Sequence, residues 1–465
     1  MNTNLSASDA TQNQSSVDES SKKIGLLFLM GGGNLGDDAT QDGMIASIKK
    51  RWPSATIWAF SMNPEYTLGR YGIPSYPISR HGWKFGNKVD STKVSFKDKA
   101  KSAAGKYQPI FTVLKAIKKV ALGLPRAFLG ELSLFVNSFL AVRKLDILVI
   151  SGGGQLVESS GSVWSLSAGP WKFPCTVFKW VLLARLNGVR RVVFNVGAGP
   201  LAHTISRSFV RGTLSLSDYS SVRDEESRTL LKQIGVKGNL PVFPDSAYTL
   251  KIPVQVLACA GSETKSVVGL APMALGDPRR SSEHDRISSD VLTRRLGAFS
   301  SWLIDKEYDV TLFCSDIAAD PPFIAELERM LAPLTEDIGR RTTAPFRRVH
   351  QWTVEELLGN MARMDYIVAS RFHTIVLAHI LNKPVLAISA HPKVTSLMND
   401  LGLAQYCVDV ADCELAVLTD KFHALVRDRE AIEDRMAARL ENYRARLSEQ
   451  FDELFSPAMM QYASR

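Results

Sequence analysis

Residues 24–38, with the sequence IGLLFLMGGGNLGDD, decide the fold class. An apolar run over 24–30 stops at three glycines, and polar residues that begin a helix over 37–51 follow. A short apolar run that ends in a glycine turn before a helix is typical of a buried strand in a parallel sheet. The segment therefore predicts the first strand, turn and helix of a doubly wound α/β sheet.

The same alternation continues along the chain and then starts again. The pattern predicts strands over 55–60, 146–150, 191–196, 219–222 and 240–243, and in the second half over 267–271, 310–314, 366–369 and 385–388. Helices are predicted over 177–186, 290–306, 322–332, 353–363 and 373–381. Strands that alternate with helices indicate a parallel sheet covered on both faces. We therefore expect two doubly wound, Rossmann-like α/β domains that face a cleft.

The length agrees with two domains, because 465 residues are about twice what one core usually supports. We expect a disordered tail over 1–22, an N-terminal α/β domain over 23–255 with an insertion at about 61–145, a C-terminal α/β domain over 256–411, and charged helices over 412–465 that pack back on the domains.

The positive charge of the chain is concentrated in one stretch. The formal net charge is +9, and residues 84–119, with ten lysines and two aspartates, carry +8 of it. Ile110, Leu114 and Ile117 recur there at helical spacing among the lysines. Such a segment is typical of contact with an anionic membrane surface, here through residues 84–124, or of a surface insertion that packs on its domain. Because no known nucleic-acid-binding module is visible in the sequence, we do not expect nucleic-acid binding.

The remaining composition limits the chemistry and the location. The five cysteines form no CxxC pair, which argues against a disulfide framework or a zinc site, and no other metal-ligand motif is present. We therefore predict no metal and no tightly bound cofactor. The first 22 residues lack a secretory signal, and no apolar stretch is long enough to cross a membrane. We expect a cytoplasmic protein, with a peripheral position on the inner face of the membrane if the basic stretch binds lipid.

Glycine turns at predicted strand ends provide candidate contacts for a ligand. The turns GGGNLGD (31–37), SGGGQ (151–155) and GAGP (197–200) each follow an apolar strand, where glycine lets the backbone approach a ligand closely. Asp37 and Asp38 either stabilise the start of their helix or accept hydrogen bonds from sugar hydroxyls. The residues that we assign to this surface, as an acceptor site, are Asn34, Asp37, Asp38, Gly153, Gly154 and Gln155.

Two cationic positions follow predicted strands. Arg223 directly follows the strand predicted over 219–222. Its guanidinium fork either binds a carboxylate or phosphate of a ligand, or forms an ordinary ion pair with Asp224 or Glu225. In Ser370-Arg371-Phe372-His373, Arg371 and His373 lie at a strand end where such sheets bind ligands. His373 either acts as a general acid beside an anionic substrate or caps its own helix. Lys393 follows the next strand and either adds charge to this anion site or is solvated.

The order of these motifs resembles the polysaccharide pyruvyl transferase family. The matching elements are Gly33-Asn34-Leu35-Gly36-Asp37-Asp38-Ala39, Gly152-Gly153-Gly154, Val222-Arg223-Asp224-Glu225-Glu226-Ser227, Pro244-Asp245-Ser246-Ala247, and Ser370-Arg371-Phe372-His373 followed by Lys393 and Leu401-Gly402-Leu403. They run in order from about residue 24 to 405 and leave out 61–145 and both ends.

The resemblance implies a fold, a reaction and roles for individual residues. Members of the family are similar to glycosyltransferases of the two-domain GT-B type and transfer pyruvate from phosphoenolpyruvate onto two hydroxyls of a sugar as a cyclic ketal, in exopolysaccharide or cell-surface glycan synthesis. By this resemblance Arg223 and Arg371 would hold the donor, and His373 would be the general acid. We assign Ser370, Phe372 and Lys393 to the donor site as well.

Two other functions remain open from the residues alone. One is a GT-B glycosyltransferase that uses a nucleotide sugar, and the other is a non-catalytic binding protein recruited to a membrane through the basic stretch. If the saccharide acceptor is polyprenyl-linked, an enzyme must reach the membrane face, which the basic stretch would serve.

Overall fold

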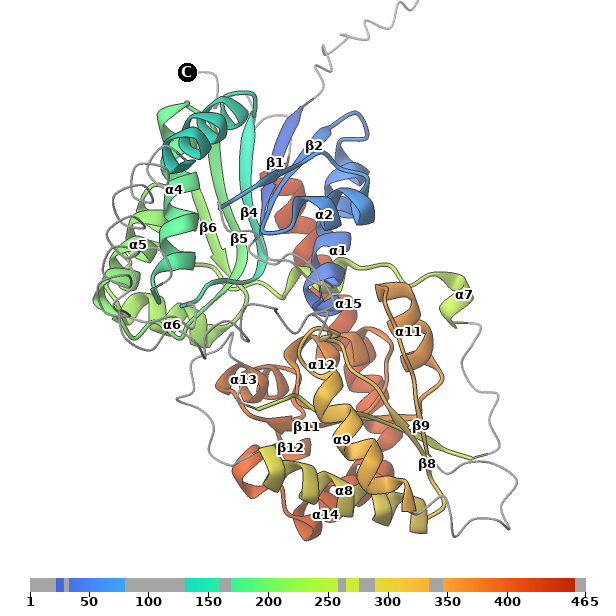
Figure 1. Ribbon diagram of the computed structural model, residues 1–465. Coiled ribbons are helices and arrows are strands. Elements are labelled where there is room, and N and C mark those ends of the chain that lie inside the picture. Colours follow the sequence, from blue (N-terminus) through green and yellow to red (C-terminus); the bar gives the residue numbers. More distant parts are fainter. Residues whose placement is uncertain are drawn as a thin grey trace, which may run out of the picture.

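The computed structural model describes residues 22–28, 33–79, 130–158, 169–257, 265–275, 289–333 and 346–455. Within these ranges the chain forms two parallel six-stranded sheets, each covered by helices (Figure 1). The predicted tail over 1–22 lies almost entirely outside the described residues, and so does the basic stretch over 84–124.

The first sheet has the strand order β3-β2-β1-β4-β5-β6. Its strands are β1 (Lys23–Leu27), β2 (Thr56–Ser61), β3 (Ser75–Pro77), β4 (Ile147–Leu156), β5 (Arg190–Ala198) and β6 (Tyr219–Val222). β1 lies between β2 and β4, and Ile24, Leu26 and Leu27 are fully buried there. A central strand buried on both faces needs an uninterrupted apolar run, which explains the sequence IGLLFLM.

The second sheet repeats this arrangement, with the order β12-β11-β10-β7-β8-β9. Its strands are β7 (Val267–Ala271), β8 (Asp309–Leu312), β9 (Phe346–Arg348), β10 (Tyr366–Ala369), β11 (Val385–Ser389) and β12 (Cys407–Asp409). Numbered from its own first strand, each sheet has the order 3-2-1-4-5-6, which is that of a Rossmann fold. The predicted fold class, two doubly wound α/β domains, is confirmed.

The helices of the first domain connect its strands and lie on both faces of the sheet (Figure 1). They are α1 (Leu35–Arg51), α2 (Pro64–Tyr71), α4 (Lys172–Leu186), α5 (Thr204–Ser215) and α6 (Glu225–Gln233), with helical residues also at 130–142. The link to the second domain holds the 3₁₀ turn η1 (Ser246–Thr249) and α7 (Val254–Leu257).

The second domain has the same layers. Its helices and 3₁₀ turns are α8 (Ser289–Asp305), α9 (Pro321–Leu331), α11 (Val354–Ala362), α12 (Phe372–Ile380), α13 (Pro392–Asp400), η3 (Ala404–Tyr406), η4 (Val410–Asp412), α14 (Leu415–Arg427) and α15 (Arg429–Leu454). Local sequence signals set several of these boundaries. At α11, for example, Thr353 and Glu356 form a reciprocal capping box that fixes the start of the helix.

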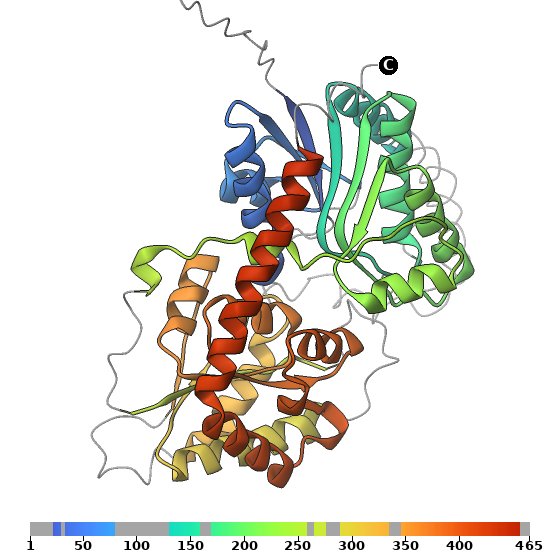
Figure 2. The same cartoon turned by 180° about the vertical axis from the view of Figure 1, so that it is seen from behind.

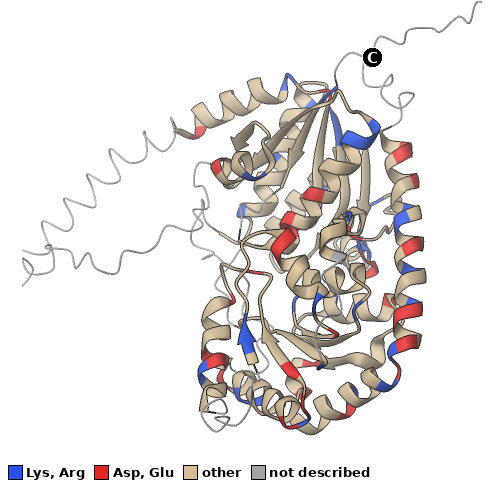
Figure 3. Ribbon diagram, turned by 90° about the vertical axis from the view of Figure 1, so that its right-hand side faces the viewer, with Lys and Arg blue, Asp and Glu red and all other residues tan. Residues whose placement is uncertain are grey.

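α15 crosses the back of the molecule and contacts both domains (Figure 2). Near its start, Nε2 of His379 in α12 lies 2.7 Å from the carbonyl oxygen of Met436. Near its end, Gln450 and Asn195 of β5 exchange hydrogen bonds of 2.8 and 2.9 Å, and Arg51 pairs with Asp452 at 2.7 Å. Acidic and basic residues mark the exposed length of this helix (Figure 3). α15 therefore braces the two domains against one another.

Three predictions at the level of segments are wrong. β4 and β5 do not stop before their glycines but continue to Leu156 and Ala198, because the strands keep pairing across a register shift. Residues 240–243 form no strand and meet β6 only through a bridge between Val222 and Val242. The insertion predicted at 61–145 is too long at both ends. Near its start, α2 and β3 belong to the first domain, and near its end, Val142 belongs to the core of that domain.

None of the helices in the described ranges combines the length and the apolar character that crossing a membrane requires.

Candidate active site

The first domain meets the second where the N-terminus of α1 faces the N-terminus of α12. The backbone N–H of Leu35 donates a 2.8 Å hydrogen bond to the carbonyl of Ser315, just after β8. The side chain of Asn34 caps α1 by accepting from the N–H of Gly36, and its backbone pairs with Asp316. The loop GGGNLGD thus joins the carboxyl ends of both sheets, the edge where doubly wound folds bind ligands.

His373, the predicted general acid, is nearly buried between two carboxylates from the other domain and the linker. Its Nδ1 lies 3.4 Å from Oδ1 of Asp37, and its Nε2 lies 3.6 Å from Oδ2 of Asp245. The hydroxyl of Thr40 lies 3.4 Å from the same Nε2. His373 is the second residue of α12, and the partners of its ring within the described residues are Asp37, Asp245 and Thr40. Such neighbours suit an acid–base group.

Asp245 connects His373 to Arg223. Its Oδ2 accepts a 2.9 Å hydrogen bond from Arg223, and its Oδ1 accepts from the backbone N–H of Ala247 at 3.0 Å. Burial acts to raise the pKa of Asp245, but the hydrogen bond and charge of His373 and the charge of Arg223 outweigh it and hold the pKa well below its usual range. Asp245 therefore carries a negative charge between the guanidinium of Arg223 and the imidazole of His373.

Arg223 is held on three sides. Besides Asp245, it lies 3.4 Å from Asp224, and its guanidinium stacks 4.2 Å from the ring centroid of Phe372. A Cβ on Gly197 would come within 2.8 Å of Nε, so the glycine leaves room for the guanidinium. Nε is buried and donates no hydrogen bond to any described residue. Both alternatives considered for Arg223, an ion pair and a fork that binds a ligand, are thus compatible with the geometry.

The environment of Arg371 differs from the one that we expected, in which its guanidinium binds the donor substrate. Its Nε and a terminal nitrogen form hydrogen bonds of 2.5 and 2.6 Å with the two oxygens of Asp320, and the second terminal nitrogen lies 3.2 Å from Asp316. All three side chains are buried. The guanidinium is therefore engaged on two edges by carboxylates that follow β8, and it fixes the loop that leads to His373.

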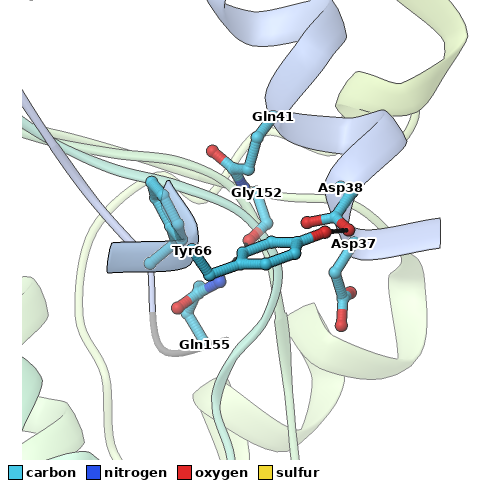
Figure 4. A pocket seen from close by; sticks show the side chains of 7 residues that line it. Asp37, Asp38, Gln41, Tyr66, Gly152 and Gln155 are labelled. Atoms are coloured by element: carbon cyan, nitrogen blue, oxygen red, sulfur yellow. Dashed lines mark hydrogen bonds between the residues drawn. The ribbon is translucent and has the colours of Figure 1, made fainter. Parts of the chain in front are cut away.

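Asp38 occupies a small polar pocket beside Asp37 (Figure 4). The hydroxyls of Tyr66 and Tyr71 donate to its two oxygens at 2.5 and 3.1 Å. Burial raises the pKa of Asp38 to about 6, although the hydrogen bond from Tyr66 and the charge of Arg70 act against this. The pocket holds about 10 Å³, enough for one water molecule or one hydroxyl group.

The glycine-rich part of β4 forms another wall of this pocket. Gly152 and Gln155 line it, and the amide of Gln155 donates 2.8 Å to the carbonyl of Gly152 (Figure 4). Gly153 has a positive φ of 73°, and a Cβ added to it would lie 3.5 Å from Oδ1 of Asp37, while Gly154 is half-buried. The structure thus brings Asp37, Asp38, Gly153 and Gln155 together. Asn34 lies near them but is occupied as a helix cap.

The remaining predicted donor residues surround Arg223 at varying distance. Phe372 provides the stacking surface already described. Ser370 is buried, and its hydroxyl forms no hydrogen bond with a described residue. Lys393 is in the first turn of α13 and is near enough to Glu226 to lower its pKa, although burial and Asp224 raise that pKa overall.

Sequence reasoning missed three residues that contact this site. Asp245 stands in the quoted motif Pro244-Asp245-Ser246-Ala247 but received no role, because its position relative to His373 depends on the linker path. Thr40 and Tyr66 follow the end of the glycine turn at Asp37 by three and 29 residues, and neither lies in a pattern that marks a site. Only Asp245, a buried aspartate directly after a proline at the end of the first domain, offered a usable signal.

The cluster can move a proton and hold an anion. His373 offers a ring nitrogen to each of two carboxylates, and a protonated ring there has its charge balanced. Arg223 and Lys393 add positive charge at the same interdomain edge. The small pocket at Asp38 offers buried oxygens to which hydroxyl groups can donate.

Comparisons with known proteins agree with this fold. The model of the polysaccharide pyruvyl transferase family matches residues 34–392, which include every site residue named above except Lys393. No curated protein matches the chain.

Solved structures with a similar fold are remote in sequence. A UDP-N-acetylglucosamine 2-epimerase matches with a TM-score of 0.52 and 11% identity, over 96% of this chain and 97% of that one. A UDP-GlcNAc 2-epimerase from Neisseria meningitidis matches with 0.50 and 12%, over 89% and 94%. A glycosyltransferase from Rickettsia africae matches with 0.50 and 11%, over 94% and 100%.

At such low identity these structures establish the fold alone, the arrangement of two Rossmann-like domains typical of GT-B proteins. The family model is more informative, because it covers about three quarters of the chain and both halves of the site. The chain belongs to the polysaccharide pyruvyl transferase family, a family of transferases.

Proposed function

We propose that this protein transfers pyruvate from phosphoenolpyruvate to two hydroxyls of a saccharide and forms a cyclic ketal. One observation carries the proposal: His373 lies between Asp37 and Asp245, and Asp245 also binds Arg223. A proton donor and an anion-binding cation are thus linked through a single buried carboxylate. Family membership supports the same reaction.

The chemistry needs one proton donor and no redox step. His373 donates a proton to the methylene carbon of phosphoenolpyruvate, which becomes a methyl group and leaves an oxocarbenium at the neighbouring carbon. A first sugar hydroxyl adds to that carbon and returns its proton to His373. Phosphate then leaves with its bonding electron pair, and the second hydroxyl adds to the same carbon. The proton of the second hydroxyl leaves with phosphate, and the ketal is closed.

Donor binding is assigned to Arg223 and Lys393. Arg223 has a buried Nε without a hydrogen bond among the described residues, and such a donor suits a carboxylate or phosphate oxygen. Phe372 holds the guanidinium in plane, and Ser370 offers a buried hydroxyl. We assign Arg371 a positioning role in place of the direct donor contact expected from the sequence, because Asp316 and Asp320 engage it.

Acceptor binding is assigned to the pocket of Asp37 and Asp38. Oδ2 of Asp37 is buried and accepts no hydrogen bond from a described residue, so a sugar hydroxyl can donate to it. Gly153, Gly154 and Gln155 form the facing backbone. Asn34 supports this site as the cap of α1.

The test of the reaction is phosphate release from phosphoenolpyruvate in the presence of pyranoside acceptors, with mass spectrometry of the sugar. The product must gain the mass of pyruvate less one water. His373→Ala is expected to reduce turnover by about a thousandfold, in the range that a lost general acid costs. His423→Ala, which removes an exposed histidine of α14, is the control. Turnover of His373→Ala equal to that of the control would show that the acid is another group.

We also propose that the protein works at an anionic membrane surface on a lipid-linked acceptor. Leu132, Phe135, Val136 and Leu140 recur at helical spacing in the helix over 130–142, and each is 40–49% exposed. The lysine-rich residues 84–119 precede this helix in the sequence. An apolar helix face next to many lysines suits a bilayer with anionic headgroups.

Flotation with vesicles tests this association. Vesicles that contain phosphatidylglycerol should carry the protein upward, and vesicles of phosphatidylcholine alone should not. Leu132→Ser with Val136→Ser should weaken the flotation, whereas Leu186→Ser, at an exposed leucine of α4, should not. Equal flotation on both kinds of vesicle would exclude electrostatic attraction.

A further inference from the structure

A cavity lined by residues of both domains lies between α6 of the first domain and α13 of the second. It has a volume of about 370 Å³ and opens at the carboxyl ends of β11 and β12. This volume falls in the range of small-molecule sites. The pocket at Asp38 is far smaller and accommodates no more than a hydroxyl group. The body of a sugar substrate therefore needs room elsewhere.

The polar lining of the cavity is built from neutral groups and two carboxylates. Thr395, Ser396 and Asn399 come from one face of α13, and Glu226 and Asp409 face them from α6 and the end of β12. The side chains of Ser396 and Asn399 form no hydrogen bond with a described residue, so their donors and acceptors are available to a ligand. Neither arginine nor lysine lines the cavity.

The rest of the cavity lining is either apolar or held in place by hydrogen bonds. Ala390, Pro392 and Val410 provide non-polar surface. The hydroxyl of Ser389 bonds the carbonyl of His391 at 3.1 Å and the hydroxyl of Thr395 at 2.8 Å, which holds the loop between β11 and α13. The cavity therefore has a rigid frame before any ligand binds.

We propose that this cavity is a saccharide subsite, which holds the part of the acceptor that does not react. Hydroxyl groups of a pyranose can donate to the carboxylates of Glu226 and Asp409 and pair with Ser396 and Asn399. Its C–H faces can pack on Pro392 and Val410. The two carboxylates disfavour an anion, which argues against a phosphate or nucleotide diphosphate in the same place.

The cavity is placed to deliver a sugar to the reacting groups. Glu226 lines it and is close enough to Arg223 and Lys393 for their charges to lower its pKa, against the larger effect of burial, which raises it. The donor cations thus border the cavity on the side of His373. This subsite rests on the proposed function, since it assumes a saccharide acceptor.

Saturation-transfer NMR without phosphoenolpyruvate tests the subsite directly. The probes are lactose, cellobiose and maltose, with the full chain. At least one disaccharide is expected to receive saturation from the wild-type protein. Asn399→Leu removes two polar atoms from the cavity and Ser396→Trp fills it, and each is expected to reduce the signal at least tenfold. Asn360→Leu, on α11, is the matched control and should keep the signal.

Enzyme kinetics and thermal unfolding complete the test. The two cavity variants should raise KM for the acceptor and leave KM for phosphoenolpyruvate unchanged, while their Tm stays near that of the control. No saturation of any probe by the wild type, or equal saturation by both cavity variants, would overturn the subsite. Saccharide binding that depends on the cavity, without phosphate release from phosphoenolpyruvate, would support the subsite and refute pyruvyl transfer.

Discussion

Gly36 of α1 lies directly against the side chain of His373 of α12. A Cβ atom on Gly36 would come within 2.6 Å of Cγ of His373 and closer still to its Cβ. No real Cβ tolerates such a distance, so the first turn of α1 can reach His373 only because residue 36 has no side chain. Gly36 in this motif is therefore needed for the close approach of the two domains as well as for the loop.

Gly36→Ala should displace His373 and reduce turnover at least tenfold. The added methyl group must push the imidazole away from Asp37 and Asp245, and overpacking of this kind costs roughly 1–3 kcal/mol. Phosphate release at saturating phosphoenolpyruvate measures the loss.

Gly69→Ala in α2 is the control, because a Cβ there meets no atom within 4 Å. It should keep wild-type turnover and gain up to about 1 kcal/mol in stability from the better helix propensity of alanine. Turnover of Gly36→Ala that matched this control would mean that His373 does not need its observed position.

Asp245→Asn should reduce both the stability and the activity of the enzyme. Arg223 would lose a buried counter-charge, and breaking such a pair costs roughly 3 kcal/mol in the free energy of unfolding. His373 would lose one of the two carboxylates that face its ring, so kcat/KM should fall. Urea unfolding and phosphate-release kinetics measure the two effects.

The exposed Asp420 provides a matched control for this substitution. Asp420→Asn should change neither the unfolding free energy nor kcat/KM. An unchanged kcat/KM in Asp245→Asn would show that Asp245 does not act on the proton donor, even if the protein is destabilised.

The strands and the approximate site could be predicted because both depend on local sequence. The apolar runs at β1 and β10 are long enough to form strands that are buried on both faces. A doubly wound sheet places the residues that directly follow its strands at one edge. His373 and Arg223 were found in this way. Short or amphipathic elements such as α2 and β3 carry too weak a periodicity, and they were read as part of an insertion.

The partners of the charged residues could not be predicted, because they depend on distant parts of the chain. Arg371 is bound by Asp316 and Asp320, about fifty residues earlier, and no spacing rule links an arginine after β10 to carboxylates after β8. The glycines at 152–154 were read as a turn because glycine is rare within strands, yet β4 continues through them with an irregular register.

Asp38→Asn should stabilise the protein at neutral pH and impair acceptor use. The folded state raises the pKa of Asp38 from 3.8 to about 6, so it binds the proton more tightly than the unfolded chain does. Stability therefore falls as the pH rises from about 4 to 6, and the full cost, roughly 3 kcal/mol, is present above that range. Asparagine removes the cost, and its amide oxygen can accept from one tyrosine hydroxyl while its NH2 donates to the oxygen of the other.

Urea unfolding at pH 8 and pH 4 measures this effect, with Asp434→Asn on the exposed side of α15 as the control. The gain of Asp38→Asn should be present at pH 8 and almost absent at pH 4. A gain of equal size at both pH values would point to packing and not to ionisation. KM for the acceptor should rise in Asp38→Asn and stay unchanged in Asp434→Asn.

His379 should make the brace formed by α15 sensitive to acid. Its Nε2 must donate to the carbonyl of Met436, so Nδ1 accepts from the hydroxyl of Tyr248 at 3.0 Å, and the ring is neutral. Burial lowers its pKa from 6.5 to about 4, against the hydrogen bond to Met436. A depressed histidine pKa contributes stability that is complete above about 6.5 and is lost as the pH falls towards 4.

Between pH 7.5 and pH 5, the stability lost through protonation of His379 amounts to about 2 kcal/mol. His379→Gln should abolish this loss, because glutamine offers a donor and an acceptor but does not ionise. Urea unfolding of His379→Gln and of the exposed control His423→Gln, at both pH values, separates the two sites. The wild type and His423→Gln should lose stability on acidification by similar amounts, while His379→Gln should lose about 2 kcal/mol less. If all three proteins lost the same amount of stability on acidification, the acid sensitivity would lie outside the contact between α12 and α15. His379 would then not be the group that makes this contact depend on pH.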